Sequence, residues 1–147
     1  MRVRDILESK GSEIVSIGEE ATIYEAAQRL NHRKIGSLLV FDYSGKIAGI
    51  ITERDILREC SEHPDEIRGR KVGDAMTREV IVGELDDRIK YVQSLMIERR
   101  IRHLPIVADE RVAGMVSIGD VIKSLLKATE DENYDLRGFL AEKNVVG

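Results

Sequence analysis

Gly49-Ile50-Ile51-Thr52-Glu53-Arg54-Asp55 has the pattern of a buried strand that runs directly into the start of a helix. The same pattern returns as Gly114-Met115-Val116-Ser117-Ile118-Gly119-Asp120. In each copy a glycine is followed by two apolar residues, a hydroxyl residue, two further residues and an aspartate. The two glycines are 65 residues apart. A repeat with so long a period indicates that the fold consists of two copies of one structural unit.

The elements around the two stretches also recur in the same order. Each unit is predicted to contain a short strand, a helix, a strand, a tight turn, a strand and a helix. The corresponding segments are an opening turn (3–7 and 72–76), the short strand (14–17 and 80–82), the first helix (22–32 and 89–96) and the second strand (36–42 and 103–107). A unit of about 60 residues buries too little apolar surface to be secure alone. We therefore expect an α+β fold in which two β-α-β-β-α units, related by a pseudo-twofold axis, pack through their sheets.

Four segments are predicted along the chain: a first repeat over 1–60, a linker over 61–71, a second repeat over 72–128, and a C-terminal helix or tail over 129–147. The linker is polar and contains Pro64 and Gly69. In the last segment Leu136, Phe139 and Leu140 have helical spacing, which favours a short helix that docks on a partner surface. A frayed tail is the alternative.

Composition and charge narrow the classes of function. Of the 147 residues 42% are apolar and 34% are charged, which is typical of a globular protein. The net charge of −4 argues against a general nucleic-acid binder, which normally carries a basic surface. The single cysteine, Cys60, excludes an intrachain disulfide. No apolar run approaches the ~20 residues that span a bilayer, and residues 1–5 lack the apolar region of a signal peptide, so we expect a cytoplasmic protein without a membrane partner.

The two hydroxyl–aspartate corners are the candidate binding sites. Thr52 is expected at a helix N-terminus, where free backbone N–H groups and the partial positive charge of the helix suit a phosphate. Asp55 lies about one turn further on nearly the same face, and its carboxylate can accept hydrogen bonds from both hydroxyls of a ribose. Ser117 and Asp120 repeat the arrangement, and Gly119 leaves room for a close backbone approach. The same pattern is also an ordinary helix cap, and one residue can serve both roles.

Further candidates lie on the strands and inside the first motif. Arg102 and His103 are phosphate candidates, because they begin the strand that we expect to face the cleft between the units. Arg54 can reach a phosphate or form a surface salt bridge. The other candidates are Ser37, which takes the place of His103 in the first unit, and four apolar residues that suit either an adenine slot or the core: Val15, Ile35, Val80 and Pro105.

The two copies differ in ways that predict different ligand preferences. The first motif carries Arg54 between its hydroxyl residue and its aspartate, whereas the second carries Gly119. Since Arg102 and His103 belong to the second unit, we predict that the second site favours a mononucleotide phosphate. We predict a different or larger ligand for the first site.

The chain resembles the tandem CBS-domain family, named after cystathionine β-synthase. The resemblance covers nearly the whole chain and is greatest to small stand-alone bacterial CBS pairs with no attached enzyme or channel. It implies adenosine-containing ligands (AMP, ADP, ATP, S-adenosylmethionine, NAD or NADH) and a disc-like homodimer. The segments that carry it are the doubled motif (49–55 and 114–120), the strands before it (35–40 and 101–107) and the two openings (3–7 and 72–76).

With this resemblance, we expect a regulatory module that senses cellular energy or redox state. An adenosyl ligand in the cleft between the units would bridge them, and it would shift their relative orientation by its differential affinity for the two arrangements. The signal would then pass to an unknown downstream protein. The alternative is a ligand-free module for dimerisation or partner interaction, against which the aspartates of both motifs argue.

An enzyme is the main rival class. The chain has no Gly-rich phosphate loop of the Walker or Rossmann type, and its spacing indicates no nucleophile–histidine–acid set. Cys60 and His63 lie in a polar segment, so we interpret them as an incidental surface pair. The three histidines lack the spacing of a zinc site. We expect no catalytic residue, no metal site and no catalytic cofactor.

Overall fold

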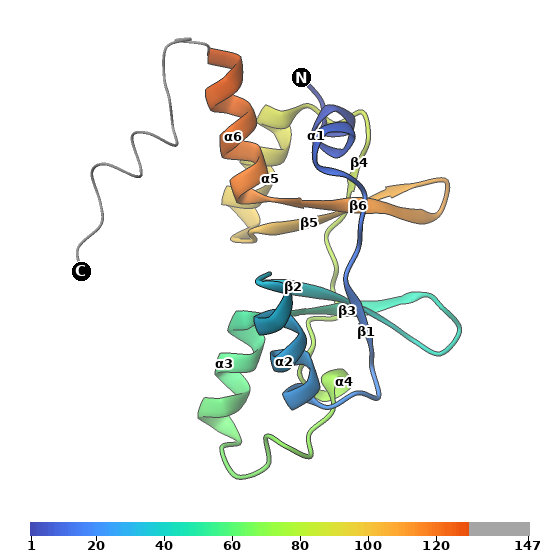
Figure 1. The fold of residues 1–147 in the computed structure, drawn as a ribbon, viewed down its shortest axis with the longest axis vertical. Helices are drawn as coiled ribbons and strands as arrows, with labels where there is room; N and C mark the ends of the chain where they lie inside the picture. Colours follow the sequence, from blue (N-terminus) through green and yellow to red (C-terminus); the bar gives the residue numbers. More distant parts are fainter. Residues whose placement is uncertain (130–147) are drawn as a thin grey trace, which may run out of the picture.

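The computed structural model describes residues 1–129 (Figure 1), so the predicted C-terminal helix or tail lies almost entirely outside the described residues. The first unit contains β1 (Ser16–Gly18), α2 (Ile23–Arg33), β2 (Ser37–Phe41), β3 (Ile47–Thr52) and α3 (Glu53–Glu62). The second contains β4 (Gly83–Glu84), α5 (Ile89–Arg99), β5 (His103–Ala108), β6 (Arg111–Ser117) and α6 (Ile118–Thr129). Two further helices open the repeats, α1 (Val3–Lys10) and α4 (Val72–Ala75).

The two sheets share one topology. Each has three strands, in the orders β1-β2-β3 and β4-β5-β6, with one parallel and one antiparallel pair. Figure 1 shows the sheets facing each other across the middle of the molecule, with α2 and α3 on the outside of one and α5 and α6 on the outside of the other. The predicted α+β fold of two units packed through their sheets is confirmed.

The first helices of the two units end alike but begin differently, because Arg88, at the start of α5, makes no side-chain cap. Thr22 caps α2 by accepting a hydrogen bond from the backbone N–H of Glu25 at 3.1 Å. The helices α2 and α5 end in the same way, at residues in the left-handed conformation, Lys34 and Arg100, each with a φ of 55°. These turns direct the chain from each helix into the central strand of its own sheet.

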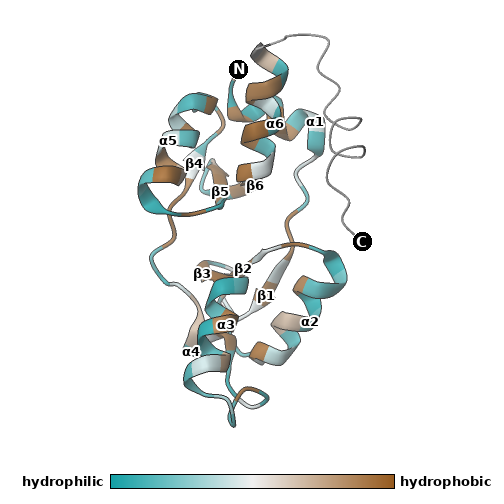
Figure 2. Ribbon diagram, turned by 90° about the vertical axis from the view of Figure 1, so that its left-hand side faces the viewer, coloured by the Kyte–Doolittle hydropathy of each residue, from teal (hydrophilic) through white to brown (hydrophobic). Residues whose placement is uncertain are grey.

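The opening helix of each repeat packs into the core of the other unit. From α1, Val3, Ile6 and Leu7 are buried in the cluster that contains the apolar residues of β5, β6 and α5. From α4, Val72 and Ala75 are buried in the cluster formed by α2, β2 and β3. Figure 2 shows the two connections that result, one from α1 to β1 and one from α4 to β4, on opposite sides of the molecule. Each unit therefore depends on residues from the opening of the other repeat.

Among residues 1–129, none of the helices has the length and apolar character that a membrane-spanning helix requires.

Candidate functional site

Both hydroxyl–aspartate corners are closed by reciprocal helix caps. Thr52 Oγ1 accepts the backbone N–H of Asp55 at 3.2 Å, and the Asp55 carboxylate accepts the N–H of Thr52 at 2.9 Å. Ser117 and Asp120 exchange the same two hydrogen bonds at 3.2 and 2.8 Å. Such a capping box satisfies backbone donors at the start of a helix. A carboxylate has about four acceptor sites, so each aspartate can also bind a further partner.

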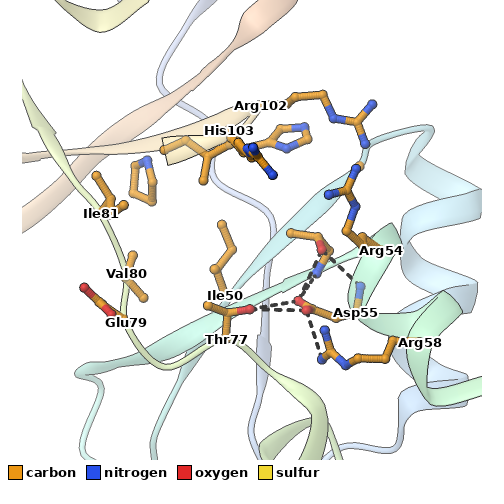
Figure 3. A pocket seen from close by; sticks show the side chains of 15 residues that line it. Ile50, Arg54, Asp55, Arg58, Thr77, Glu79, Val80, Ile81, Arg102 and His103 are labelled. Carbon is orange, nitrogen blue, oxygen red and sulfur yellow. Dashed lines mark hydrogen bonds and ion pairs between the residues drawn. The ribbon is translucent and has the colours of Figure 1, made fainter. Parts of the chain in front are cut away.

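Asp55 is almost fully buried, with 3% of its surface exposed. Besides the cap, its carboxylate accepts a hydrogen bond from Thr77 Oγ1 at 3.2 Å and pairs with Arg58 Nη2 at 3.1 Å. Arg58 lies one turn further along α3, and Thr77 follows α4. Figure 3 shows these partners converging on one carboxylate at the edge of a pocket. Donors from two separate segments therefore hold the carboxylate of Asp55 in place.

Asp120 has a different partner from Asp55. Lys10 Nζ, at the end of α1, donates to Asp120 Oδ2 at 2.8 Å and to the backbone oxygen of Met115 at 3.0 Å. Burial of the Asp120 carboxylate opposes its ionisation, but the hydrogen bonds from Lys10 and Ser117 outweigh this effect and lower the pKa of Asp120 below its usual value. The second corner therefore carries an ionised carboxylate paired with a lysine.

A cavity of about 270 Å³ lies beside the first corner, between the two units. We call it the Thr52 cleft; its walls are the β3–α3 corner, the connection over 77–81, and the start of β5. Figure 3 shows Val80 and Ile81 on one side of this cleft and Arg54 on the other. Seven of the residues predicted from the sequence line it: Thr52, Arg54, Asp55, Val80, Arg102, His103 and Pro105.

A second cavity, of about 310 Å³, lies beside Ser117. We call it the Ser117 cleft. Its lining includes Lys10 and Met115 as well as residues from the α1–β1 connection and from the start of β2. Five of the predicted residues are found here: Val15, Ile35, Ser37, His103 and Ser117.

The two clefts mix residues of both repeats. Sequence analysis assigned Arg102 and His103 to the site of the second motif; the structure places both in the lining of the Thr52 cleft, and His103 in that of the Ser117 cleft as well. It likewise places Ser37, a first-unit residue, in the Ser117 cleft. The cause is the face-to-face packing of the sheets: His103 pairs with Ser117 through the backbone, while its side chain faces the other unit. Each corner is therefore completed by a strand from the opposite repeat.

Positive charge is concentrated in the Thr52 cleft. Four arginines line it, and only Arg58 has an ion-pair partner within residues 1–129. Figure 3 shows the side chains of Arg54, from α3, and Arg102, directly before β5, approaching each other. Like charges that are brought together repel, and an anion between them relieves the repulsion. Glu79 and Asp55 are the acidic residues of this lining.

His103 forms part of the wall of both clefts. Burial of its imidazole lowers the pKa of His103 below 6.5, and the charge of Arg102 lowers it further, whereas Glu53 acts in the opposite direction. The side chain is therefore neutral at pH 7.

Sequence reasoning missed several residues of the site. Thr77, Arg58 and Lys10 hold the two aspartates. Arg58 stands three residues after Asp55, a helical spacing that could have indicated it, whereas Thr77 and Lys10 reach the corners only through the crossed packing of α4 and α1. Gly119 lines neither cleft, and an added Cβ there would meet only Ser117 Oγ, at 3.6 Å. Asp120 lies in the wall of a smaller cavity of about 120 Å³ that Lys10 also lines.

One group of side chains in the described part of the chain has the composition of a metal site, namely Glu59, Glu62 and His63. Buried Glu59 already pairs with Arg70 at 2.9 Å, and this ion pair accounts for the burial of its charge. Cys60 is exposed and lies in α3 rather than in a linker.

Comparison with known proteins identifies the architecture. The model of the CBS domain matches residues 3–62 and again residues 72–127. The chain belongs to the CBS-domain family. This CBS pair is 32% identical over 146 residues to the mitochondrial CBS domain-containing protein CBSX3 of Arabidopsis thaliana, an alignment that covers 94% of the chain and 71% of that protein.

Solved structures agree with this assignment. A CBS-domain-containing protein from Agrobacterium tumefaciens has a TM-score of 0.82 and 35% identity to this CBS pair, covering 84% of the chain and 92% of that protein. The CBS domain pair of protein MJ0100 was solved in complex with 5′-methylthioadenosine and S-adenosyl-L-methionine. It has a TM-score of 0.75 and 30% identity, with 88% of this chain and 98% of that chain covered.

Proposed function

We propose that this CBS pair is a regulatory module that binds an adenosine nucleotide in the Thr52 cleft. One observation carries the proposal: the cleft brings Asp55 together with Arg54 and Arg102, which approach each other without an acidic partner among residues 1–129. The complex of the MJ0100 CBS pair with two adenosine-containing ligands supports the ligand class.

The lining of the cleft suits the three parts of such a ligand. Val80, Ile81 and Pro105 offer an apolar wall for the adenine. Asp55 accepts the ribose hydroxyls. They replace the hydroxyl of Thr77, which donates to the Asp55 carboxylate at 3.2 Å. The phosphate then lies at the N-terminus of α3, where helix N–H groups and the nearby arginines stabilise negative charge.

We move the predicted preference for a phosphate from the second site to the Thr52 cleft. Since Arg102 and His103 line the Thr52 cleft, we assign the mononucleotide phosphate, or a ligand with more phosphates such as ADP or ATP, to this cleft. NAD or NADH would place one of its phosphates in the same position. The Ser117 cleft, which has fewer basic residues, binds a second adenosyl ligand.

A homodimer fits the outer face of the helices. Leu57 of α3 and Ile97 of α5 are 71% and 68% exposed, and Ile122 of α6 is also exposed. Exposed apolar side chains of this size mark interaction surfaces when they gather on one face. Figure 1 shows α3 and α6 on the same side of the molecule. A ligand that alters the angle between the units would move these helices and so change the surface presented to a downstream protein.

A thermal-shift panel tests the binding of nucleotides. AMP, ADP, ATP, NAD, NADH and S-adenosylmethionine would be added at millimolar concentration. At 100 times the dissociation constant a ligand stabilises the folded state by about 2.7 kcal/mol, which raises the melting temperature by roughly 5–10 °C for a chain of this size. The double substitution Arg54→Ala/Arg102→Ala should reduce the shift by phosphorylated ligands, because it removes binding in the Thr52 cleft. No shift with any compound would overturn the proposal and favour a ligand-free dimerisation module.

A further inference from the structure

Lys10 occupies a position that no pattern in the sequence assigned to a site. It is the last residue of α1, which is twice as long as the corresponding helix α4, with 8 residues against 4. The additional turn brings the lysine to the second corner. Leu7 fixes α1 there, because it packs so closely on Gly114 that a Cβ at that glycine would lie 2.7 Å from Leu7 Cδ2. The position of Lys10 is thus set by buried packing.

The contacts of Lys10 use two of its three donors. Nζ donates to Asp120 Oδ2 and to the backbone oxygen of Met115, at 2.8 and 3.0 Å. An ammonium group has three donors and no acceptor. The side chain also lines the Ser117 cleft. One donor of the ammonium group therefore remains for a ligand in the Ser117 cleft.

The two corners differ at this point. At Asp55 the segment after the opening helix supplies a neutral hydroxyl, Thr77, and the cation comes from Arg58 within α3. At Asp120 the opening helix itself supplies the cation. Lys123 stands three residues after Asp120, as Arg58 stands three residues after Asp55, yet it forms no ion pair among the described residues.

Two lysines, Lys10 and Lys34, line the Ser117 cleft. Glu13 lines the cleft but pairs with Arg33. Lys34 lines it from the C-terminal end of α2. His103 is neutral at pH 7. Lys10 is therefore the lysine of this lining whose position is fixed, by its contacts with Asp120 and with the backbone oxygen of Met115.

We propose that Lys10 determines the charge preference of the Ser117 cleft, selecting adenosine ligands with an anionic 5′ substituent over those with a neutral or cationic one. This inference rests on the proposed function, because it requires an adenosyl ligand in that cleft. A 5′-phosphate gains a charge-assisted hydrogen bond from the third donor of Lys10. A thioether gains none, and a sulfonium is repelled.

The test compares 5′-AMP, 5′-methylthioadenosine and S-adenosylmethionine by NMR titration of the full chain, following the backbone amides of Ser37 and Ser117. These amides report the Ser117 cleft, and those of Thr52 and Arg54 report the other cleft in the same spectra. We expect AMP to bind the Ser117 cleft about tenfold more tightly than the thioether. Lys10→Met should reduce this ratio to near one by weakening AMP alone, and it should improve S-adenosylmethionine.

Three further variants separate charge from structure. Lys10→Arg should keep the preference, and Lys10→Gln should lose it although it can still donate hydrogen bonds. Lys123→Met, the matched control, should bind as the wild type does. An unchanged ratio in Lys10→Met, or an equal change in Lys123→Met, would overturn the inference. Binding reported only by the amides of Thr52 and Arg54 would overturn it while leaving the proposed function intact, and no binding at either cleft would overturn both.

Discussion

The imidazole of His103 lies directly against the backbone of Gly36. A Cβ built on Gly36 would be 2.9 Å from Cε1 of His103 and 2.7 Å from Oε1 of Glu53, distances at which something must move. Gly36 precedes β2 of the first unit, whereas His103 begins β5 of the second. Both residues line both clefts. This contact is therefore the place where the two units and the two candidate sites meet.

The first prediction is that Gly36→Ala changes ligand binding more than stability. The atoms that a methyl group would meet are the ends of flexible side chains, so His103 and Glu53 can turn away, and we expect the free energy of unfolding to change by less than about 1 kcal/mol. Displacement of His103 should weaken AMP binding in the Thr52 cleft about tenfold, the value of one charge-assisted hydrogen bond. Calorimetric titration and urea unfolding measure the two effects.

Gly18→Ala is the control for this variant, because nothing lies within 4 Å of its added Cβ. It should bind AMP as the wild type does. Equal losses of affinity in the two variants would show that the His103–Gly36 contact has no special role.

The second prediction concerns pH. The folded protein holds His103 at a pKa below the 6.5 of the unfolded chain, mainly through burial. Between these two values the unfolded chain binds more protons, so His103 lowers the free energy of unfolding as pH falls below 6.5. A bound phosphate favours the imidazolium and raises the pKa, so phosphorylated ligands should bind more tightly at pH 6.0 than at pH 7.5.

Urea unfolding and calorimetric titration at the two pH values measure these opposite trends. His103→Gln should remove the part of each trend that His103 causes; the pH dependence that remains belongs to the other groups of the chain and to the ligand phosphate, whose second pKa is about 6. If the variant and the wild type depend on pH identically, His103 titrates in neither process.

The third prediction follows from the crossed packing of α1. Leu7 belongs to the first repeat in sequence but is buried in the core of the second unit. Leu7→Ala should lower the free energy of unfolding by about 2–5 kcal/mol, the usual cost of truncating a buried leucine. Hydrogen exchange should accelerate first in the amides of β5 and β6. Met76→Ala, from the segment after α4, should instead affect β2 and β3 first; the reverse pattern would contradict the crossed arrangement.

The fourth prediction compares the two aspartates. Asp55 is buried and has partners in Thr52, Thr77 and Arg58, so Asp55→Asn should cost about 1–3 kcal/mol of unfolding free energy. Asp120 forms a partly exposed pair with Lys10, and Asp120→Asn should cost roughly 0.2–1 kcal/mol. Urea unfolding at pH 7 measures both, and a larger loss at Asp120 would show that burial does not determine the difference.

Acid should reduce the effect of the Asp120 substitution. The folded pKa of Asp120 lies below its usual 3.8, so its stabilising contribution is present above pH 3.8 and is lost as pH falls through the folded pKa. The wild type and Asp120→Asn should therefore converge in stability at low pH. A constant difference between them would mean that ionisation of this carboxylate does not stabilise the fold.

Much of this protein is determined by its sequence alone. The Thr52–Asp55 and Ser117–Asp120 corners, the order of strands and helices, and the α+β class all follow from patterns that extend over a few consecutive residues. Apolar periodicity and helix caps are local properties, because they depend on neighbours along the chain. The doubling of the pattern was sufficient to predict two units packed through their sheets, and the structure agrees.

The composition of each site was decided only by the tertiary structure. No local pattern shows that α1 crosses to the second unit, that Lys10 thereby reaches Asp120, or that His103 lies on Gly36 and completes a cleft begun by Thr52. These contacts join residues from 67 to 110 positions apart, as Gly36 and His103, and Lys10 and Asp120, illustrate. They arise because neither unit buries enough apolar surface alone, so each takes its opening helix from the other repeat and faces its sheet toward it.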